Sequence, residues 1–159
     1  MQEGYFKMAN IRQAKSCESE TLTRIAIESE AYWGYDKDFM KKFKSIYKIT
    51  EDFISDSPTF VVEEDGRILG FYGILNKEKE TSLEYLYIEP KSIGKGYGKL
   101  LWNHIIKICK ENGVNKIELV TSPQAVEFYT KMGAMQTGEV ESLVIQGRII
   151  PKLVYIIDK

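Results

Sequence analysis

The alternation of apolar and polar residues is clearest in the middle of the chain. Residues 83–88 are rich in aromatic and branched side chains, which predicts a strand buried on both faces. Pro90 ends this strand because proline has no N–H to donate to a neighbour. Apolar residues then recur at helical spacing, which predicts a helix that ends at Asn112-Gly113. The apolar stripe of this helix contains Leu101, Ile105 and Ile108.

The first part of the chain predicts a strand, three helices and a hairpin. A weak alternation from Met8 to Ala14 indicates the strand, and the helices begin near Ser19 or Thr21, at Asp36 and at Thr50. The hairpin joins two strands through Asp65-Gly66, a dipeptide typical of tight turns. These strands are Thr59–Glu63 and Ile68–Leu75.

The last part of the chain predicts three strands and one helix. A short strand covers Lys116–Thr121, and Ser122-Pro123 supplies the cap and first residue of a helix through Met132. Strands at Glu139–Ile145 and Lys152–Ile157 follow. This order predicts an α/β (α+β) fold, a mixed sheet with helices on its faces. Neither a repeat nor a linker divides the chain, so residues 1–159 are predicted to form one domain.

Composition and charge exclude several classes of protein. The chain has 159 residues and a net charge of −1, so nothing indicates a nucleic-acid-binding or membrane-surface protein. Five lysines between residues 37 and 48 predict a solvated helix face. Only two cysteines occur, no apolar run could span a bilayer, and Met1–Gly4 lacks signal-peptide features. We therefore expect a reduced, cytoplasmic protein, and we see no metal-binding pattern.

A glycine-rich loop lies between the central strand and its helix. Ile93–Lys99 contains three glycines, and the N–H groups at the following helix start have no partner within the helix. Such a loop favours an anion, most often phosphate. The spacing G-x-G-x-G does not fit a dinucleotide fold, and Leu100 after Gly98-Lys99 does not fit a P-loop.

This stretch resembles the pyrophosphate loop of the GNAT superfamily, the acyl-CoA-dependent N-acyltransferases. Gly96 and Gly98 match the two small positions of the family's loop, whereas Ile93 stands where arginine or glutamine is usual. Ala125–Gly133 resembles the family's next helix, and Tyr155–Ile157 resembles its last strand. The resemblance is strong from residue 82 to 133 and weaker before Pro58.

The resemblance implies a GNAT-like domain with a mixed, mostly antiparallel sheet and helices on both faces. Two central strands, Glu84–Ile88 and Lys116–Thr121, are expected to splay apart and hold acetyl-CoA, the acyl donor, between them. Ser122 is expected either to contact the coenzyme or only to cap its helix. The other expected coenzyme-binding residues are Leu86, Tyr87 and Ile88 on the strand and Ile93, Gly94, Lys95, Gly96, Tyr97, Gly98 and Lys99 in the loop.

Attack of an amine on a thioester needs a base, an N–H donor for the oxyanion and an acid for the leaving thiolate. Glu84 is the candidate base, since it precedes the pantetheine-binding positions and shares the side-chain parity of Leu86. A solvated carboxylate at a strand end is the alternative. Tyr129 matches the family's tyrosine near the coenzyme sulfur, and packing within a helical stripe is its alternative.

Aromatic residues near Gly34 fall where the resemblance puts the acceptor wall. Trp33 and Tyr35 are the candidate acceptor-binding residues, and ordinary core packing is the expected role of at least half of the aromatic cluster Tyr32, Trp33, Tyr35 and Phe39. His104 is interpreted as a structural or surface residue, and Cys109 is an unlikely nucleophile because it has no helix start or basic partner nearby in the sequence. The predicted function is transfer of an acetyl group to a primary amine by direct attack in a ternary complex.

The sequence leaves other functions open. A non-catalytic acyl-CoA sensor or assembly domain would keep the loop but need neither Glu84 nor Tyr129. Transfer to a hydroxyl group, or transfer of a longer acyl chain, is a further alternative. The sequence identifies neither the acceptor nor the oligomeric state, and a homodimer stays open.

Overall fold

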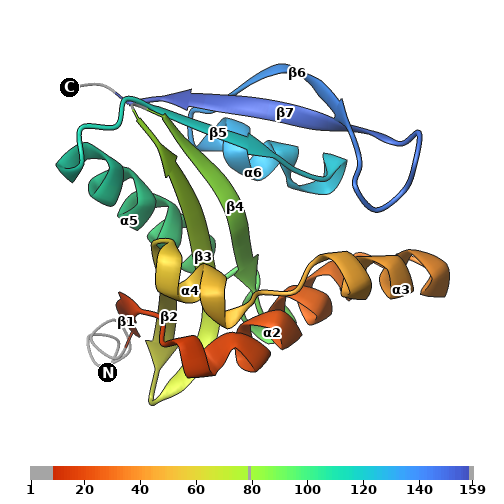
Figure 1. Ribbon diagram of the computed structural model, residues 1–159, viewed down its shortest axis with the longest axis horizontal. Coiled ribbons are helices and arrows are strands. Elements are labelled where there is room, and N and C mark those ends of the chain that lie inside the picture. The colour runs from red at the N-terminus through yellow and green to blue at the C-terminus, as the bar shows by residue number, and fades with distance from the viewer. Residues whose placement is uncertain (1–8, 79, 158–159) are drawn as a thin grey trace.

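The computed structural model describes residues 9–78 and 80–157, which form one seven-stranded sheet in the order β1-β2-β3-β4-β5-β7-β6 (Figure 1). Neighbouring strands are antiparallel except for the parallel pair β4 and β5. The strands are β1 Ala9–Gln13, β2 Thr59–Glu64, β3 Arg67–Lys77, β4 Glu80–Ile88, β5 Lys116–Val120, β6 Met135–Glu141 and β7 Ile149–Ile156. The predicted mixed, mostly antiparallel sheet is confirmed, while the predicted start of the first strand, Met8, lies outside the described residues.

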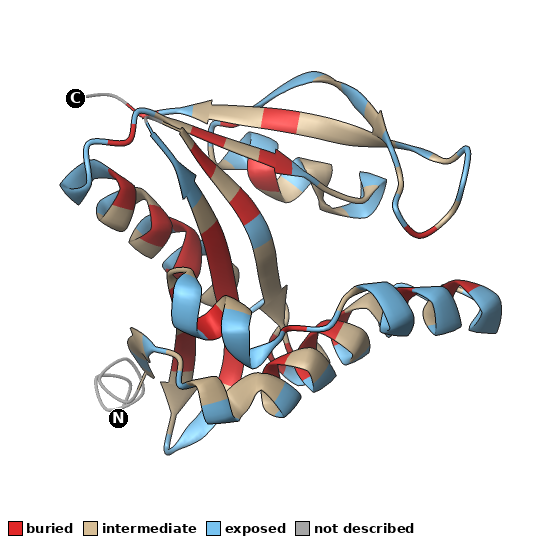
Figure 2. Ribbon diagram, viewed as in Figure 1, coloured by how far each residue is buried: buried red, intermediate tan, exposed pale blue. Residues whose placement is uncertain are grey.

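Helices cover both faces of the sheet, as predicted. The helices are α2 Ser19–Ala31, α3 Lys37–Ile46, α4 Glu51–Asp56, α5 Tyr97–Glu111 and α6 Val126–Lys131, and the 3-10 turns are η1 Ser16–Glu18, η2 Pro90–Ser92 and η3 Pro123–Ala125. On one face, α5 and α6 bury a core around Trp102 and Ile105. On the other face, α2 and α4 pack over Val61 and Phe71 (Figure 2). None of the helices in the described ranges is long and apolar enough to cross a membrane.

The sheet opens in its middle, between β4 and β5. These strands pair only between Glu80–Leu83 and Lys116–Leu119. Figure 1 shows β4 curving away from β5 beyond this point. The backbone edge of residues 84–88 that faces β5 therefore has no partner strand, and the predicted splay of the two central strands is confirmed.

A β-bulge interrupts the alternation of β4 at Glu84. Gly73 pairs with Tyr85, whereas the next residue of β3, Ile74, pairs with Leu83, so Glu84 is the extra residue. As a result Leu83 and Leu86 pack into the same core although they differ in parity. The parity that linked Glu84 to Leu86 in the sequence is thus broken. Residues 85–88 are only half-buried, not buried on both faces as predicted, because a cavity lies beside them.

Both strands of the C-terminal hairpin begin earlier in the sequence than predicted. The strands were expected at residues 139–145 and 152–157, but β6 covers Met135–Glu141 and β7 covers Ile149–Ile156. The apolar run Leu143–Ile145 lies in the connecting loop, where Val144 packs against Phe39 and Phe43 of α3. The hydrophobicity of this run reflects contact with a distant helix and not membership of a strand.

Candidate active site

A cavity of about 710 Å³ occupies the gap between β4 and β5. Both candidate catalytic residues, Glu84 and Tyr129, line it. Of the expected coenzyme-binding residues, nine line the cavity, while Lys95 and Tyr97 do not. The nine are Leu86, Tyr87, Ile88, Ile93, Gly94, Gly96, Gly98, Lys99 and Ser122. The gap therefore brings together residues that are far apart in the sequence.

The glycine loop forms one end of the cavity. Gly94 and Gly96 have φ angles of 84° and 91°, the left-handed region that glycine adopts without a steric penalty. The 15-residue helix α5 begins at Tyr97 directly after this loop. Its first N–H groups have no partner within the helix, and its dipole adds positive potential there. This end of the cavity therefore suits a phosphate group.

A third glycine allows the start of α5 to lie close to a side chain of α6. A Cβ atom at Gly98 would lie 3.2 Å from Cε1 of Phe128, closer than most Cβ atoms approach a neighbour. The absence of a side chain at Gly98 therefore leaves room for the Phe128 ring, which also lines the cavity.

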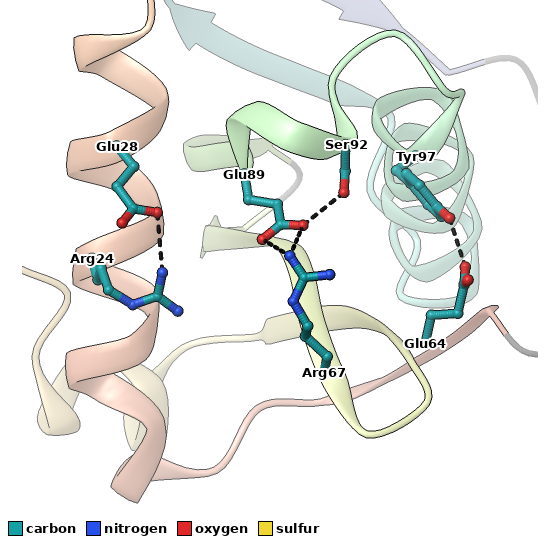
Figure 3. A network of polar contacts seen from close by, with 7 residues as sticks. All are labelled: Arg24, Glu28, Glu64, Arg67, Glu89, Ser92 and Tyr97. Carbon is teal, nitrogen blue, oxygen red and sulfur yellow. Dashed lines mark hydrogen bonds and ion pairs between the residues drawn. The ribbon is translucent and has the colours of Figure 1, made fainter.

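Polar contacts hold both ends of the loop (Figure 3). On the N-terminal side, Glu89 is buried, accepts two hydrogen bonds from Arg67 at 2.6 and 2.5 Å, and accepts a third from Ser92 at 2.8 Å. On the C-terminal side, the Tyr97 hydroxyl donates to Glu64 of β2 at 2.6 Å. This bond explains why the Tyr97 side chain does not line the cavity. Fixed anchors on both sides favour a preformed anion site.

Glu84 is exposed and lies on the wall formed by β4. The Ser82 hydroxyl donates a 2.5 Å hydrogen bond to one of its carboxylate oxygens. The bulge brings these two side chains together, and both line the cavity. The carboxylate can therefore accept a proton from a molecule in the cavity while its second oxygen is held by Ser82.

Tyr129 lies across the cavity on α6 and is 6% exposed. Its ring packs edge-on against Trp102, with centroids 5.7 Å apart, and against Phe128 at 5.1 Å. Burial alone raises the pKa of the Tyr129 hydroxyl above its ordinary value, so the group keeps its proton near neutral pH. Tyr129 can therefore pack in the core and also donate a proton, because it lines the cavity although most of its ring is buried.

Ser122 stands where β5 meets the next helical segment. It precedes Pro123, as predicted, but its side chain makes no capping hydrogen bond, and a 3-10 turn comes before α6. The predicted cap position is confirmed, but the side-chain hydrogen bond of a cap is not made. A capping side chain accepts a hydrogen bond from the second or third residue of the helix, and the Ser122 side chain makes no such bond. Ser122 lines the cavity.

The opposite end of the cavity is formed by α2, α3 and the loop between β6 and β7. Trp33 lines it, whereas Tyr35 lies behind the wall. The Tyr35 hydroxyl donates to Gln124 at 3.0 Å and accepts a hydrogen bond from Arg148 at 3.3 Å. Tyr35 thus joins the α2–α3 segment to two parts of the C-terminal half.

Sequence reasoning missed three residues at this end, namely Glu30, Tyr47 and Arg148, which all line the cavity. Burial raises the pKa of Glu30 above its ordinary value, and the positive charge of Arg148 opposes this shift. One signal was present in the sequence. Glu30 follows Ala26 by four residues and therefore continues the buried stripe of α2, where a carboxylate is unusual.

His104 and Cys109 have structural positions. The Tyr72 hydroxyl lies 2.8 Å from Nδ1 of His104, and Phe60 packs against the imidazole ring. Cys109 is buried in the core beneath α5, where burial raises the pKa of its thiol. Neither residue lines the cavity.

The chain is similar to known acetyltransferases over most of its length. The model of the acetyltransferase (GNAT) family matches residues 22–134. An uncharacterized N-acetyltransferase of Methanocaldococcus jannaschii, MJ1207, is 30% identical over 121 residues, which are 65% of this chain and about half (51%) of that protein. The peptidyl-lysine N-acetyltransferase YjaB of Salmonella typhimurium is 30% identical over 141 residues, 84% of this chain and 88% of that protein.

Solved structures agree with the fold. The PaiA N-acetyltransferase of Thermoplasma acidophilum, a coenzyme A complex, has a TM-score of 0.79 at 20% identity and covers 93% of this chain and 98% of its own. YncA of Salmonella typhimurium, a putative acetyltransferase with acetyl-CoA, has a TM-score of 0.68 at 17% identity, with 95% of each chain covered. At these identities the likeness establishes the fold. Because the family model spans more than two thirds of the described residues, the chain belongs to the acetyltransferase (GNAT) family, as the sequence predicted.

Proposed function

We propose that this chain transfers an acetyl group from acetyl-CoA to a primary amine by direct attack in a ternary complex. One observation carries the proposal. A single cavity reaches from the glycine loop to a carboxylate, Glu84, and a protonated phenol, Tyr129. Membership of the acetyltransferase family supports acetyl-CoA as the donor. The names of the relatives, N-acetyltransferases, support an amine as the acceptor.

The coenzyme would bind along the cavity in two parts. Its pyrophosphate would lie against the N–H groups from Gly94 to the start of α5, where the glycine conformations and the helix dipole favour negative charge. Its pantetheine arm would hydrogen-bond the free edge of β4 at residues 86–88, as an added strand does. The Ser122 hydroxyl, which caps no helix, would contact the same arm.

Glu84 and Tyr129 would each carry out one proton transfer of the reaction. A primary amine is mostly protonated at neutral pH, so it passes one proton to Glu84, directly or through a water molecule, and attacks the thioester carbonyl as the neutral form. The nitrogen loses its second proton to water as the C–N bond forms. The C–S bond then breaks, and Tyr129 donates its proton to the leaving thiolate. The products are the N-acetyl amine and free coenzyme A.

A screen of acceptors tests the proposal. The protein is incubated with acetyl-CoA and single amines, amino acids, polyamines or lysine-containing peptides, and release of free thiol is followed. We expect release that depends on one class of amine and an acetylated product of the matching mass. A protein that binds acetyl-CoA by calorimetry yet releases thiol with no acceptor would contradict the proposal and favour a sensor.

A further inference from the structure

Four aromatic rings form a ladder along α3 and its flanking loops. Tyr35, Phe39, Phe43 and Tyr47 follow one another with centroid distances of 4.0, 6.3 and 4.6 Å. Their planes differ by only 18–22° from one ring to the next. Their spacing of four residues places them on one side of the helix. Aromatic faces carry negative potential, so a ladder of near-parallel rings can hold a cation.

One end of the ladder already holds a cation of this chain. The guanidinium of Arg148 lies 5.3 Å from the ring centre of Tyr35 and 5.6 Å from that of Phe39. It also donates a hydrogen bond to the Tyr35 hydroxyl. Arg148 belongs to the loop between β6 and β7, which lies on the same side of the molecule as α3 (Figure 1). The chain itself thus shows which kind of group this surface binds.

Phe39, Phe43 and Tyr47 line the cavity, and two carboxylates act on the Tyr47 end of the ladder. Phe43 and Tyr47 line the cavity together with Glu30 and Glu84. Both carboxylates act electrostatically on Tyr47: after burial, they are the causes that raise the pKa of its hydroxyl. Within the described ranges, no basic side chain forms an ion pair with Glu30, and Arg148 reaches it only through its longer-range field. Two carboxylates and two aromatic rings therefore line the same cavity, and no ion pair neutralises Glu30 within the part of the chain that the structure describes.

We propose that this end of the cavity binds a second cationic group of the acceptor, so that the preferred acceptors are amines with two positive charges. Glu30, Phe43 and Tyr47 would hold the non-reacting ammonium, while the reacting amine lies near Glu84. The inference rests on the proposed function for the reacting amine, but the cation site itself does not depend on transfer. Glu30 is thus a specificity-determining residue and has no part in the proton transfers.

An acceptor with a carboxylate would use the site differently. Arg148 also lines the cavity and could pair with that carboxylate. Its guanidinium is, however, already engaged by two rings and a hydroxyl, whereas Glu30 is not paired. Placing an acidic group between Glu30 and Glu84 would also bring like charges together. These contacts favour the cationic acceptor.

Binding of inert cations tests the site without any transfer. The probes are pentyltrimethylammonium and pentamethylene-bis(trimethylammonium), which cannot accept an acetyl group, added to the protein saturated with coenzyme A. We expect the bis-quaternary probe to bind more tightly, and Glu30→Gln to weaken it about tenfold, since a half-buried ion pair exceeds the value of an exposed one. Glu28→Gln is the matched control, because Glu28 lies on the same helix, exposed and outside the cavity. Equal affinity of both probes, or no effect of Glu30→Gln, would overturn the inference.

Turnover gives a second, separable test. The ratio of kcat/KM for a diamine to that for the alkylamine of equal length should exceed one and fall about tenfold in Glu30→Gln, chiefly through KM. A preference for amino acids that disappears in Arg148→Gln would instead overturn the inference in favour of a carboxylate-binding site. If the bis-quaternary probe binds through Glu30 but no amine is acetylated, the cation site stands and the proposed function fails.

Discussion

The Ser82 hydroxyl donates a 2.5 Å hydrogen bond to the carboxylate of Glu84, two residues along the same strand. The contact arises at the β-bulge, where Glu84 is the extra residue between two registers of pairing with β3. Bulges often redirect a side chain next to a functional site. Here the bulge places a carboxylate from the middle of β4 on the cavity wall and next to the Ser82 hydroxyl.

Replacing Glu84 by glutamine should lower turnover while coenzyme affinity is kept. Glutamine preserves size and hydrogen bonding to Ser82 but cannot accept the proton, a role worth roughly 10²–10⁴-fold in rate. The loss should shrink as pH rises, because more of the acceptor is already neutral. The pH dependence of kcat/KM, measured beside calorimetric binding of acetyl-CoA, checks both statements. Glu127→Gln, on an exposed part of α6, is the control. A variant with the parent's pH–rate profile would remove Glu84 from the mechanism.

Replacing Tyr129 by phenylalanine should lower turnover more than coenzyme affinity. The ring contacts with Trp102 and Phe128 remain, and only the proton donor for the thiolate is lost. We expect a fall of roughly 10²–10⁴-fold in kcat, the usual range for one general acid. Tyr155→Phe is a matched control, since Tyr155 also packs against Trp102 but lies outside the cavity. Turnover within a few-fold of the parent would assign Tyr129 to packing.

A β-branched residue at Gly96 should weaken coenzyme binding. Gly96 has open space around its Cβ position, so valine would not clash, but its φ of 91° would be strained. Relief of about 1–3 kcal/mol of strain would reshape the loop, and affinity for acetyl-CoA should fall about tenfold or more. Gly66→Val serves as the control, because Gly66 has φ 76° in a hairpin turn outside the cavity. Unchanged affinity by calorimetry in Gly96→Val would displace the pyrophosphate from this loop.

Local patterns were enough to predict most of the fold. The strand, glycine loop and helix from residue 80 to 111 lie next to one another in the chain, so their signals needed no distant partner. The buried face of α5 is nevertheless centred on Leu101, Ile105 and Cys109, with Trp102 beside them, while Ile108 is half-buried. Most strands of the sheet are distant from α5 in the sequence. Packing against these strands decides which residues of the apolar stripe are buried.

The parts that failed depend on contacts between distant segments. The bulge at Glu84 exists because β3 and β4 change register, and a single strand does not record its partner's register. Leu143–Ile145 was predicted as part of a strand because it is apolar. Its apolar side chains pack against α3, which lies about 100 residues earlier in the sequence. Glu30 and Arg148 line one cavity although a similar separation in sequence divides them, so no local motif marked the acceptor end.

Glu30 should reduce the stability of the empty protein at neutral pH. Burial raises the pKa of its carboxyl in the folded state, so the folded protein binds a proton more readily than the unfolded chain does. The free energy of unfolding therefore falls as pH rises through the interval between the unfolded and folded pKa values. Arg148 opposes this effect without reversing it, and the neighbouring Tyr47 and Tyr87 stay neutral because burial raises their pKa values too.

Glu30→Gln removes that charge, so we expect a higher melting temperature than the parent at pH 7. The difference should vanish at a pH below about 4, where the unfolded carboxyl is itself protonated. Thermal unfolding of both proteins without ligand, over a series of pH values, measures it. Glu28→Gln should give no such gain, since Glu28 forms an exposed pair with Arg24. A less stable Glu30→Gln protein at pH 7 would mean that the carboxylate has a favourable partner within the fold. A gain in stability together with weaker binding of the bis-quaternary probe would show that the charge of Glu30 strengthens cation binding and lowers the stability of the ligand-free protein.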